Sequence, residues 1–149
     1  MKIGDEINQR KFSSEAQKAY VNIIFTSNWL QAAVRDLLKP YGLTLQQYNV
    51  LRILRGKHPE CANPSEIKNV MIDKNPDLTR LCDRMVMNGW LHREIDSQNR
   101  RKMRIIITRT GLELLDVLDP VIQEHTEGLN KLSDDENKIL SDLLDKLRG

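Results

Sequence analysis

The sequence predicts a mainly α-helical protein with one small β-hairpin, and three features favour this class. Two short helical patterns stand close together at residues 63–71 and 75–88. Apolar and polar residues then alternate at 90–108, which is typical of strands. Long helical patterns flank this centre on both sides. Two short helices followed by a hairpin make a winged helix-turn-helix, so we expect that fold with N- and C-terminal dimerisation helices around it.

The N-terminal flank predicts one long helix. Residues 1–11 carry no regular pattern, and an apolar spacing of three and four then continues to Pro40. Ser13 or Ser14 can cap the start of the helix, and the residue before a proline disfavours the helical conformation. Between residues 20 and 34 the apolar side chains occupy more than one face. We therefore expect this helix to serve both the core and a subunit interface.

Two capping boxes mark the helices that follow. Thr44 with Gln47 starts a helix that runs to about Arg55, and Asn63-Pro64-Ser65-Glu66 starts the first helix of the pair. In such a box the cap side chain accepts a hydrogen bond from the backbone N–H three residues later, and the side chain there reaches back.

The segment from Asn75 to Asn88 is the predicted recognition helix. Asn75 can cap it and Pro76 fits its first position, which leaves about four residues, 72–75, for the turn. Gly89 fits a left-handed C-terminal cap. The apolar stripe that we expect to be buried consists of Leu78, Leu81, Cys82, Met85 and Val86.

The hairpin has an apolar side and a cationic tip. Strands are predicted at 90–95 and 102–108, and the second strand puts Met103, Ile105 and Ile107 on one side. The turn between the strands is polar and contains adjacent arginines.

After the hairpin the sequence predicts two more helices. Thr108 can cap the first, and Pro120 lies inside its pattern, where it should bend or break the helix. Ser133 with Glu136 forms a capping box for a final, leucine-rich helix. An amphipathic, leucine-rich helix on a chain of this size needs a partner surface, which is either a second subunit or the rest of its own subunit.

The order and spacing of five segments resemble the MarR family, the multiple-antibiotic-resistance type of bacterial transcriptional regulator. The segments are GLTLQQYNVLRIL (42–54), NPSEIKNVM (63–71), LTRLCDRMVMNGWL (78–91), DSQNRRKMRIIIT (96–108) and TRTG (108–111). The resemblance implies a homodimer that binds double-stranded DNA at a pseudo-palindromic operator, and a repressor released by a small-molecule effector. The alternative is a winged-helix module that binds protein and not DNA.

The candidate DNA-binding residues lie on the polar face of the recognition helix and at the wing tip. An arginine in the major groove can bind guanine in a bidentate manner or hold a phosphate, and narrow A·T minor grooves attract arginine. By resemblance to the family, Arg101 is the residue for the minor groove. Arg84 can instead pair with Asp83 or reach the wing, and Asp83 is expected to orient an arginine. The candidates are Lys74, Asn75, Asp77, Thr79, Arg80, Arg84, Arg100, Arg101 and Lys102.

The resemblance also implies an aromatic or anionic effector between the dimer helices and the DNA-binding lobe. Trp29, Tyr41 and Tyr48 are the candidate lining residues, although aromatic residues at helical spacing are also ordinary core residues. The expected division by role is 1–42 for dimerisation, 43–110 for the winged helix-turn-helix lobe and 111–149 for dimerisation, within one continuous domain.

Charge is unevenly distributed along the chain. The net charge of +2 combines 19 basic and 11 acidic residues in 1–110 with 4 basic and 10 acidic residues in 111–149. A basic body suits a polyanionic partner, and two oppositely charged solvated surfaces would give the same numbers.

Other classes of function find little support in the sequence. The three histidines are isolated, and His58 with Cys61 makes a weak metal pair; no glycine-rich phosphate loop is present. We therefore expect no enzyme, no metal and no cofactor. Cys82 should be a buried core residue. Residues 1–12 have no apolar core of a signal peptide and no run is long enough to span a bilayer, so a cytoplasmic location is expected.

Overall fold

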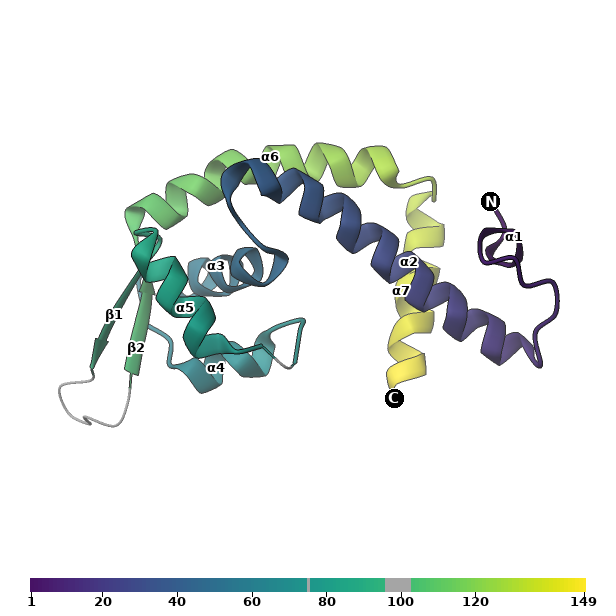
Figure 1. Ribbon diagram of the computed structural model, residues 1–149, viewed down its shortest axis with the longest axis horizontal. Helices are drawn as coiled ribbons and strands as arrows, with labels where there is room; N and C mark the ends of the chain where they lie inside the picture. The colour runs from purple at the N-terminus through teal and green to yellow at the C-terminus, as the bar shows by residue number, and fades with distance from the viewer. Residues whose placement is uncertain (75, 96–102) are drawn as a thin grey trace. The chain divides into compact units, whose positions relative to one another are not determined.

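The computed structural model describes residues 1–74, 76–95 and 103–149. The helices are α1 (Ile3–Glu6), α2 (Glu15–Leu38), the 3-10 helix η1 (Lys39–Tyr41), α3 (Leu45–Lys57), α4 (Pro64–Val70), α5 (Leu78–Met87), α6 (Arg109–Leu129) and α7 (Asp134–Arg148) (Figure 1). Strands β1 (Leu91–Ile95) and β2 (Met103–Ile107) form an antiparallel hairpin. The predicted mainly α fold with one hairpin wing is confirmed.

The chain divides into two compact units, residues 1–116 and 117–149. The boundary lies inside α6, so one continuous helix belongs to both units. Within the described residues, no helix combines the length and the apolar composition needed to cross a membrane. The division by role at residues 42 and 110 remains a prediction.

Helices α2, α3, α4 and α7 begin where local sequence signals place them. At each of these four starts, a side-chain oxygen accepts a hydrogen bond from a backbone N–H of the first turn, which would otherwise have no partner. The residues that accept in this way are Ser14, Thr44, Asn63 and Ser133, and the last three form full capping boxes with Gln47, Glu66 and Glu136.

The core of the first unit forms where α3, α4, α5 and the hairpin meet. Figure 1 shows these elements gathered together, with the two strands extending from them. Each element supplies apolar side chains that are at most 1% exposed, so the small helices are stabilised by packing more than by their length. These side chains are Val50, Leu51 and Leu54 of α3, Ile67 of α4 with Met71 after it, Met85 of α5 and Ile105 of β2.

The start of α6 is tied to the end of α5 through the base of the hairpin. Gly89 has a φ of +74°, the left-handed conformation predicted for the cap. The Thr108 hydroxyl donates to the Gly89 carbonyl at 2.6 Å and accepts from the Gly111 N–H at 3.2 Å, so it caps α6 as predicted. A Cβ on Gly111 would lie 2.5 Å from the Trp90 carbonyl oxygen. Only glycine fits this contact without a shift of the backbone.

The flanks differ from the prediction at two places. Residues 1–11 contain a single helical turn, α1, and its Ile3 is only 6% exposed. One turn is too short to produce a periodic apolar pattern, so this helix could not be predicted from the sequence. Of the two effects predicted for Pro120, a break does not occur, because α6 runs through it; a bend there stays a prediction. Proline removes one hydrogen bond of the helix, and the complete burial of Leu115 and Leu118 on the preceding turn favours keeping the helix intact.

Candidate nucleic-acid interface

Helix α5 buries one face and exposes the other. Leu78, Cys82 and Met85 recur at helical spacing and are buried. The polar candidates Thr79, Arg80 and Arg84 are exposed on the helix. This is the separation that a recognition helix needs, because the buried side fixes the helix and the exposed side can reach a ligand.

The start of α5 differs from the prediction. Asp77, and not Asn75, is the N-cap, and its carboxylate accepts from the Arg80 N–H at 3.2 Å. Pro76 therefore precedes the helix. Both Asn75-Pro76 and Asp77 carry capping chemistry, and buried Leu78 selects the later start because it anchors the first turn. A carboxylate at this end of a helix also interacts favourably with the helix dipole.

The connection between α4 and α5 is longer than predicted. Seven residues, 71–77, separate the two helices instead of about four. Met71 is fully buried at its start. Lys74 is exposed, and its ammonium donates to the Asn69 carbonyl at the end of α4 at 2.9 Å. Asn75, a predicted contact, lies outside the described residues.

The arginines of α5 stand in solvent while its Asp83 is paired. The described part of the chain offers the guanidinium groups of Arg80 and Arg84 neither a hydrogen bond nor an ion pair. Asp83 forms an ion pair with Arg93 of β1 instead of with Arg84. Asp83 thus orients an arginine, as expected, but it is an arginine of the wing that sequence reasoning had not selected.

The wing is joined to the lobe on its second strand as well. Strands β1 and β2 pair from Leu91 with Ile107 to Ile95 with Met103. Ala62 extends the sheet by a bridge to Ile105. Arg104 donates to the Cys61 sulfur at 2.9 Å and lies 3.7 Å from the Glu94 carboxylate.

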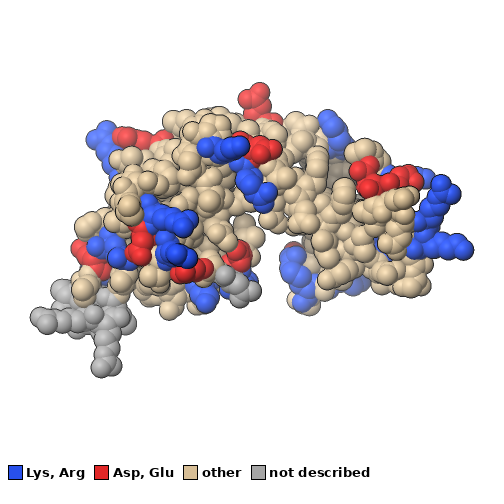
Figure 2. All heavy atoms as spheres, viewed as in Figure 1, with Lys and Arg blue, Asp and Glu red and all other residues tan. Residues whose placement is uncertain are grey.

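The wing-tip candidates Arg100, Arg101 and Lys102 lie outside the described residues. What the structure describes is the base of the hairpin from which they extend. Figure 2 shows lysine and arginine side chains, interspersed with acidic ones, over the lobe that contains α5 and this hairpin. The lobe thus presents cations beside the exposed face of the predicted recognition helix.

The two cysteines occupy different surroundings. Cys82 is 2% exposed, and burial raises the pKa of its thiol to about 11. Nearby Arg93 opposes this rise and Asp83 adds to it. Cys82 is the buried core residue that the apolar stripe predicts. Cys61 is half-buried.

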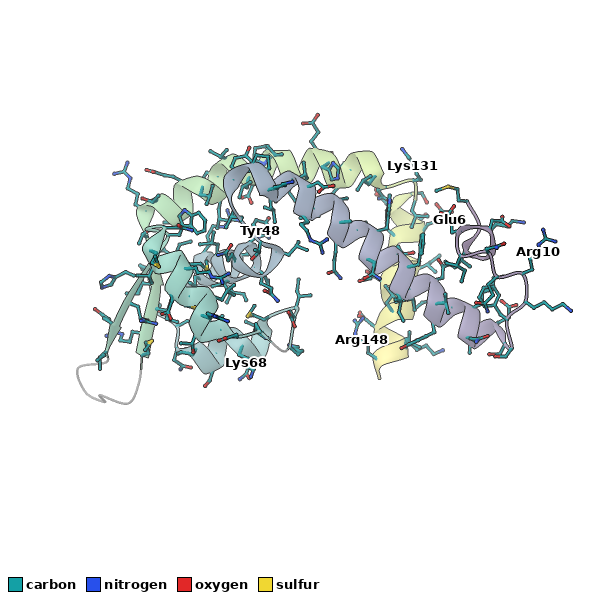
Figure 3. All side chains as sticks on the ribbon, viewed as in Figure 1. Glu6, Arg10, Tyr48, Lys68, Lys131 and Arg148 are labelled. Carbon is teal, nitrogen blue, oxygen red and sulfur yellow. The ribbon has the colours of Figure 1, made fainter. Side chains whose placement is uncertain are left out.

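The three effector candidates lie on α2, η1 and α3. Trp29 is 47% exposed on α2, and Tyr41 and Tyr48 are half-buried. Tyr48, marked in Figure 3, has a partner within its own helix, because Arg52 donates to its hydroxyl at 2.9 Å. A site for an effector on these residues remains a prediction. In the described part of the chain, no three His, Cys, Asp or Glu residues are grouped as a metal site would need.

Sequence reasoning missed side chains that hold the site without being part of it. These side chains are Arg93 of β1 and Gln46 and Asn49 of α3. Gln46 and Asn49 are three residues apart and therefore share one face of α3. That spacing of two amides on the polar side of the helix was the only signal that could have drawn attention to them.

The short helix α4 precedes α5, which buries one face and exposes the other, and an anchored hairpin follows. This arrangement defines the class of the protein as a winged helix-turn-helix regulator. The MarR family model matches residues 43–103. MarR of Escherichia coli is 28% identical over 116 residues, which cover 76% of this chain and 79% of that protein. PecS of Dickeya dadantii, named as a transcriptional regulator, is 29% identical over 123 residues, 79% of this chain and 72% of that protein.

Solved structures agree with these sequence relatives. The MarR transcription factor from Planctomyces limnophilus is 35% identical, with a TM-score of 0.69 over 91% of this chain and 98% of that one. Mutant MarR from Escherichia coli complexed with operator DNA has 26% identity and a TM-score of 0.79 over 92% of this chain and 98% of that one. The chain belongs to the MarR family and is a DNA-binding transcriptional regulator.

Proposed function

We propose that this regulator is a homodimeric repressor that binds a pseudo-palindromic operator in double-stranded DNA. The observation that carries the proposal is the exposed polar face of α5, whose arginines have no described partner while the opposite face is buried. Each subunit would insert α5 into a major groove. Two half-sites would then lie about one helical turn, roughly 34–36 Å, apart.

We expect different residues in and near α5 to contact the bases and the phosphates of the DNA. Arg80 and Arg84 are one helical turn apart and can face the same groove, where a bidentate contact to guanine discriminates between bases. Thr79 and Lys74 suit phosphate contacts that fix the register of the protein on the duplex. Asn75 completes the predicted set at the start of the helix. Asp77, as the N-cap, would contribute by fixing the first turn.

The wing would bind beside the same groove. Arg100, Arg101 and Lys102 lie in the sequence between β1 and β2, the two strands of a hairpin that is anchored to α5 through Asp83 and Arg93. Arg101 is the residue that we assign to the minor groove, because narrow A·T stretches concentrate negative potential.

Dimerisation would cover the apolar faces of α2 and α7. Helix α2 exposes large side chains such as Tyr20 and Trp29, and among its residues only Leu38 is buried. Helix α7 has no buried residue, and its apolar stripe of Ile139, Leu140, Leu143 and Leu147 is 45–68% exposed. Contiguous apolar surface of this kind marks an interaction site, and a second copy of the chain is the partner that satisfies a palindromic operator.

Repression would be relieved by a small aromatic or anionic effector. BpsR of Bordetella bronchiseptica, whose DNA binding is regulated by 6-hydroxynicotinic acid, provides a precedent. It has a similar fold, and its sequence is 19% identical to this chain. Trp29, Tyr41 and Tyr48 remain our candidate contacts. The effector would act by favouring a spacing of the two recognition helices that does not fit the groove. The protein would act in the cytoplasm, where a bacterial chromosome lies.

The test is fluorescence anisotropy of labelled DNA, titrated with protein at two salt concentrations. The probes are DNA from upstream of the protein's own gene and a site selected from a random pool, each with random competitor. We expect specific binding that weakens as salt rises, because phosphate contacts release counterions. Equal, weak binding to the selected site and to random DNA would instead favour the alternative, a winged-helix module for protein partners.

Arg80→Ala separates base reading from phosphate binding in the same assay. If Arg80 reads a base, the variant should lose about 1–3 kcal/mol of binding free energy and tolerate changes at one base position. A loss that is the same on every sequence would assign Arg80 to a phosphate. Arg109→Ala, an exposed arginine at the start of α6 that pairs with Glu113, is the matched control and should leave base preference unchanged.

A further inference from the structure

The connection between α4 and α5 is held by side chains from a third helix. Asn49 of α3 accepts a hydrogen bond from the Ile72 N–H at 3.0 Å. Gln46 of α3 donates its side-chain amide to the Asp73 carboxylate at 2.5 Å. The partners are 23 and 27 residues apart in sequence. These are tertiary contacts and not local turn bonds.

Packing does not explain the path of this segment. Met71 and Leu78 are buried at its two ends, but the Ile72 side chain is 86% exposed. Asp73 and Lys74 are exposed as well. A stretch that buries so little apolar surface gains little from the hydrophobic effect, so hydrogen bonds to neighbouring elements decide where its backbone runs.

The segment that follows contains most of the predicted DNA contacts. Lys74 comes directly after Asp73, and Asp77 then caps the helix that presents Thr79 and Arg80. A shift of the Ile72–Asp73 backbone would therefore move the entry into α5. Contacts to base edges tolerate such shifts poorly, because bidentate hydrogen bonds depend on direction. Phosphate attraction is less directional.

We propose that Gln46 and Asn49 are positioning residues for sequence-specific DNA binding. They hold Ile72 and Asp73 so that Lys74 and the first turn of α5 meet the groove in a fixed register. They touch no DNA in this proposal and act through the connection. The inference rests on the proposed function of α5 and adds α3 as the element that sets its entry.

A donor–acceptor exchange tests the Gln46 contact. Gln46→Glu places two carboxylates against each other and should break the bond. Gln46→Glu combined with Asp73→Asn restores one donor and one acceptor in the opposite order, and its net charge equals that of the original protein. Asp73→Asn alone is the control for the loss of the Asp73 charge, because the amides at positions 46 and 73 can still form a hydrogen bond.

Asn49 provides an independent arm. Asn49→Leu keeps the size of the side chain and removes the acceptor for the Ile72 N–H. Asn49→Asp keeps that acceptor and adds a negative charge. The neutral variant should therefore damage specific binding more than the charged one, which is the reverse of what simple repulsion by the DNA phosphates would give.

The readout is the ratio of affinities for a selected operator and for random DNA, measured at one salt concentration. We expect Gln46→Glu and Asn49→Leu to lower operator affinity about tenfold, the equivalent of one lost hydrogen bond, and the ratio to fall with it. The exchange variant should recover most of the ratio. The melting temperature, followed by circular dichroism, should change little because both bonds are at the surface.

Two outcomes would overturn the inference. One is an unchanged ratio in Gln46→Glu and Asn49→Leu while the original protein binds its operator specifically, which leaves the proposed function intact. The other is a large fall in melting temperature that accounts for the loss of binding, which would make the two residues merely structural. If the original protein shows no specific binding at all, the proposed function fails first and the inference fails with it.

Discussion

The lobe that contains α3, α4, α5 and the hairpin differs from helices α2 and α7 in whether its apolar side chains are buried or exposed. In the lobe, residues such as Leu51, Ile67 and Met85 are fully buried within one chain. In α7, Leu143 and Leu147 are 59% and 68% exposed. The lobe thus buries its apolar side chains within a single copy, whereas α2 and α7 leave theirs exposed. In the function that we propose, DNA contact and self-association therefore belong to different parts of the chain.

The largest expected effect comes from a charge on the exposed stripe of α7. Leu143→Lys should separate the two subunits, because a lysine in a dimer interface would have to be desolvated without a partner. Loss of the second half-site removes the gain from bivalency, so operator affinity should drop about 10²-fold or more. Analytical ultracentrifugation and anisotropy would measure the two losses.

Ser141→Lys is the control for this variant. Ser141 is exposed on α7 beside the apolar stripe. Its replacement by lysine adds the same charge to the same helix. It should leave the mass and the affinity unchanged. A dimer that persists in Leu143→Lys would show that α7 is not part of the interface. The exposed stripe of α7 would then not be explained by self-association.

Truncation of a buried leucine in the lobe should act on stability and not on assembly. Leu51→Ala should cost about 2–5 kcal/mol of unfolding free energy through lost contacts and the cavity left behind. Leu147→Ala removes the same atoms from an exposed site and is the matched variant. Thermal unfolding at several protein concentrations would separate them: the loss in Leu51→Ala should not depend on concentration, and that in Leu147→Ala should.

A smaller effect is expected where the lobe joins α5 to the wing. Asp83→Asn weakens the ion pair with Arg93, whose side chains are 47% and 33% exposed, and such pairs contribute about 0.2–1 kcal/mol. Operator affinity should fall by at most about fivefold, more at low salt than at high salt. Glu113→Gln, which removes an exposed carboxylate paired with Arg109, should not change binding.

The smallest effect at neutral pH concerns Cys82. Its folded pKa of about 11 lies above the usual value of a cysteine in an unfolded chain, about 8.5. A raised pKa means that the folded state favours the neutral thiol. This contribution is fully present below about pH 8.5 and is lost as pH rises towards 11. Urea unfolding of the original protein and of Cys82→Ala should therefore give a stability difference that is constant from pH 6 to 8 and shrinks at pH 10.

Much of the fold could be predicted because its signals are local. The caps at Thr44, Asn63 and Ser133 each depend on a pair of residues three positions apart, and each was found in the structure. The hairpin and its apolar side followed from alternation. The predicted start of α5 was wrong because both Asn75 and Asp77 have a side chain that can cap a helix. Local chemistry alone does not decide between two such caps.

The candidate site could be predicted only in part, for a different reason. The polar face of α5 follows from helical spacing, so Thr79, Arg80 and Arg84 were accessible to sequence reasoning. The contacts of Asp83 with Arg93 and of Asn49 with Ile72 join elements that only tertiary packing brings together. A pattern within one helix contains no information about such partners.

The close approach at Gly111 has a consequence for how freely this sequence can vary. The Trp90 carbonyl oxygen and the Ile107 side chain occupy the space that any side chain at position 111 would need, at 2.5 and 2.8 Å from an ideal Cβ. Gly56 and Gly128 face open space by the same measure. The contact between the hairpin and the start of α6 thus tolerates no side chain at position 111, whereas positions 56 and 128 have room for one. A library built to redirect this regulator to new operators can randomise the face of α5 but has to keep that contact fixed.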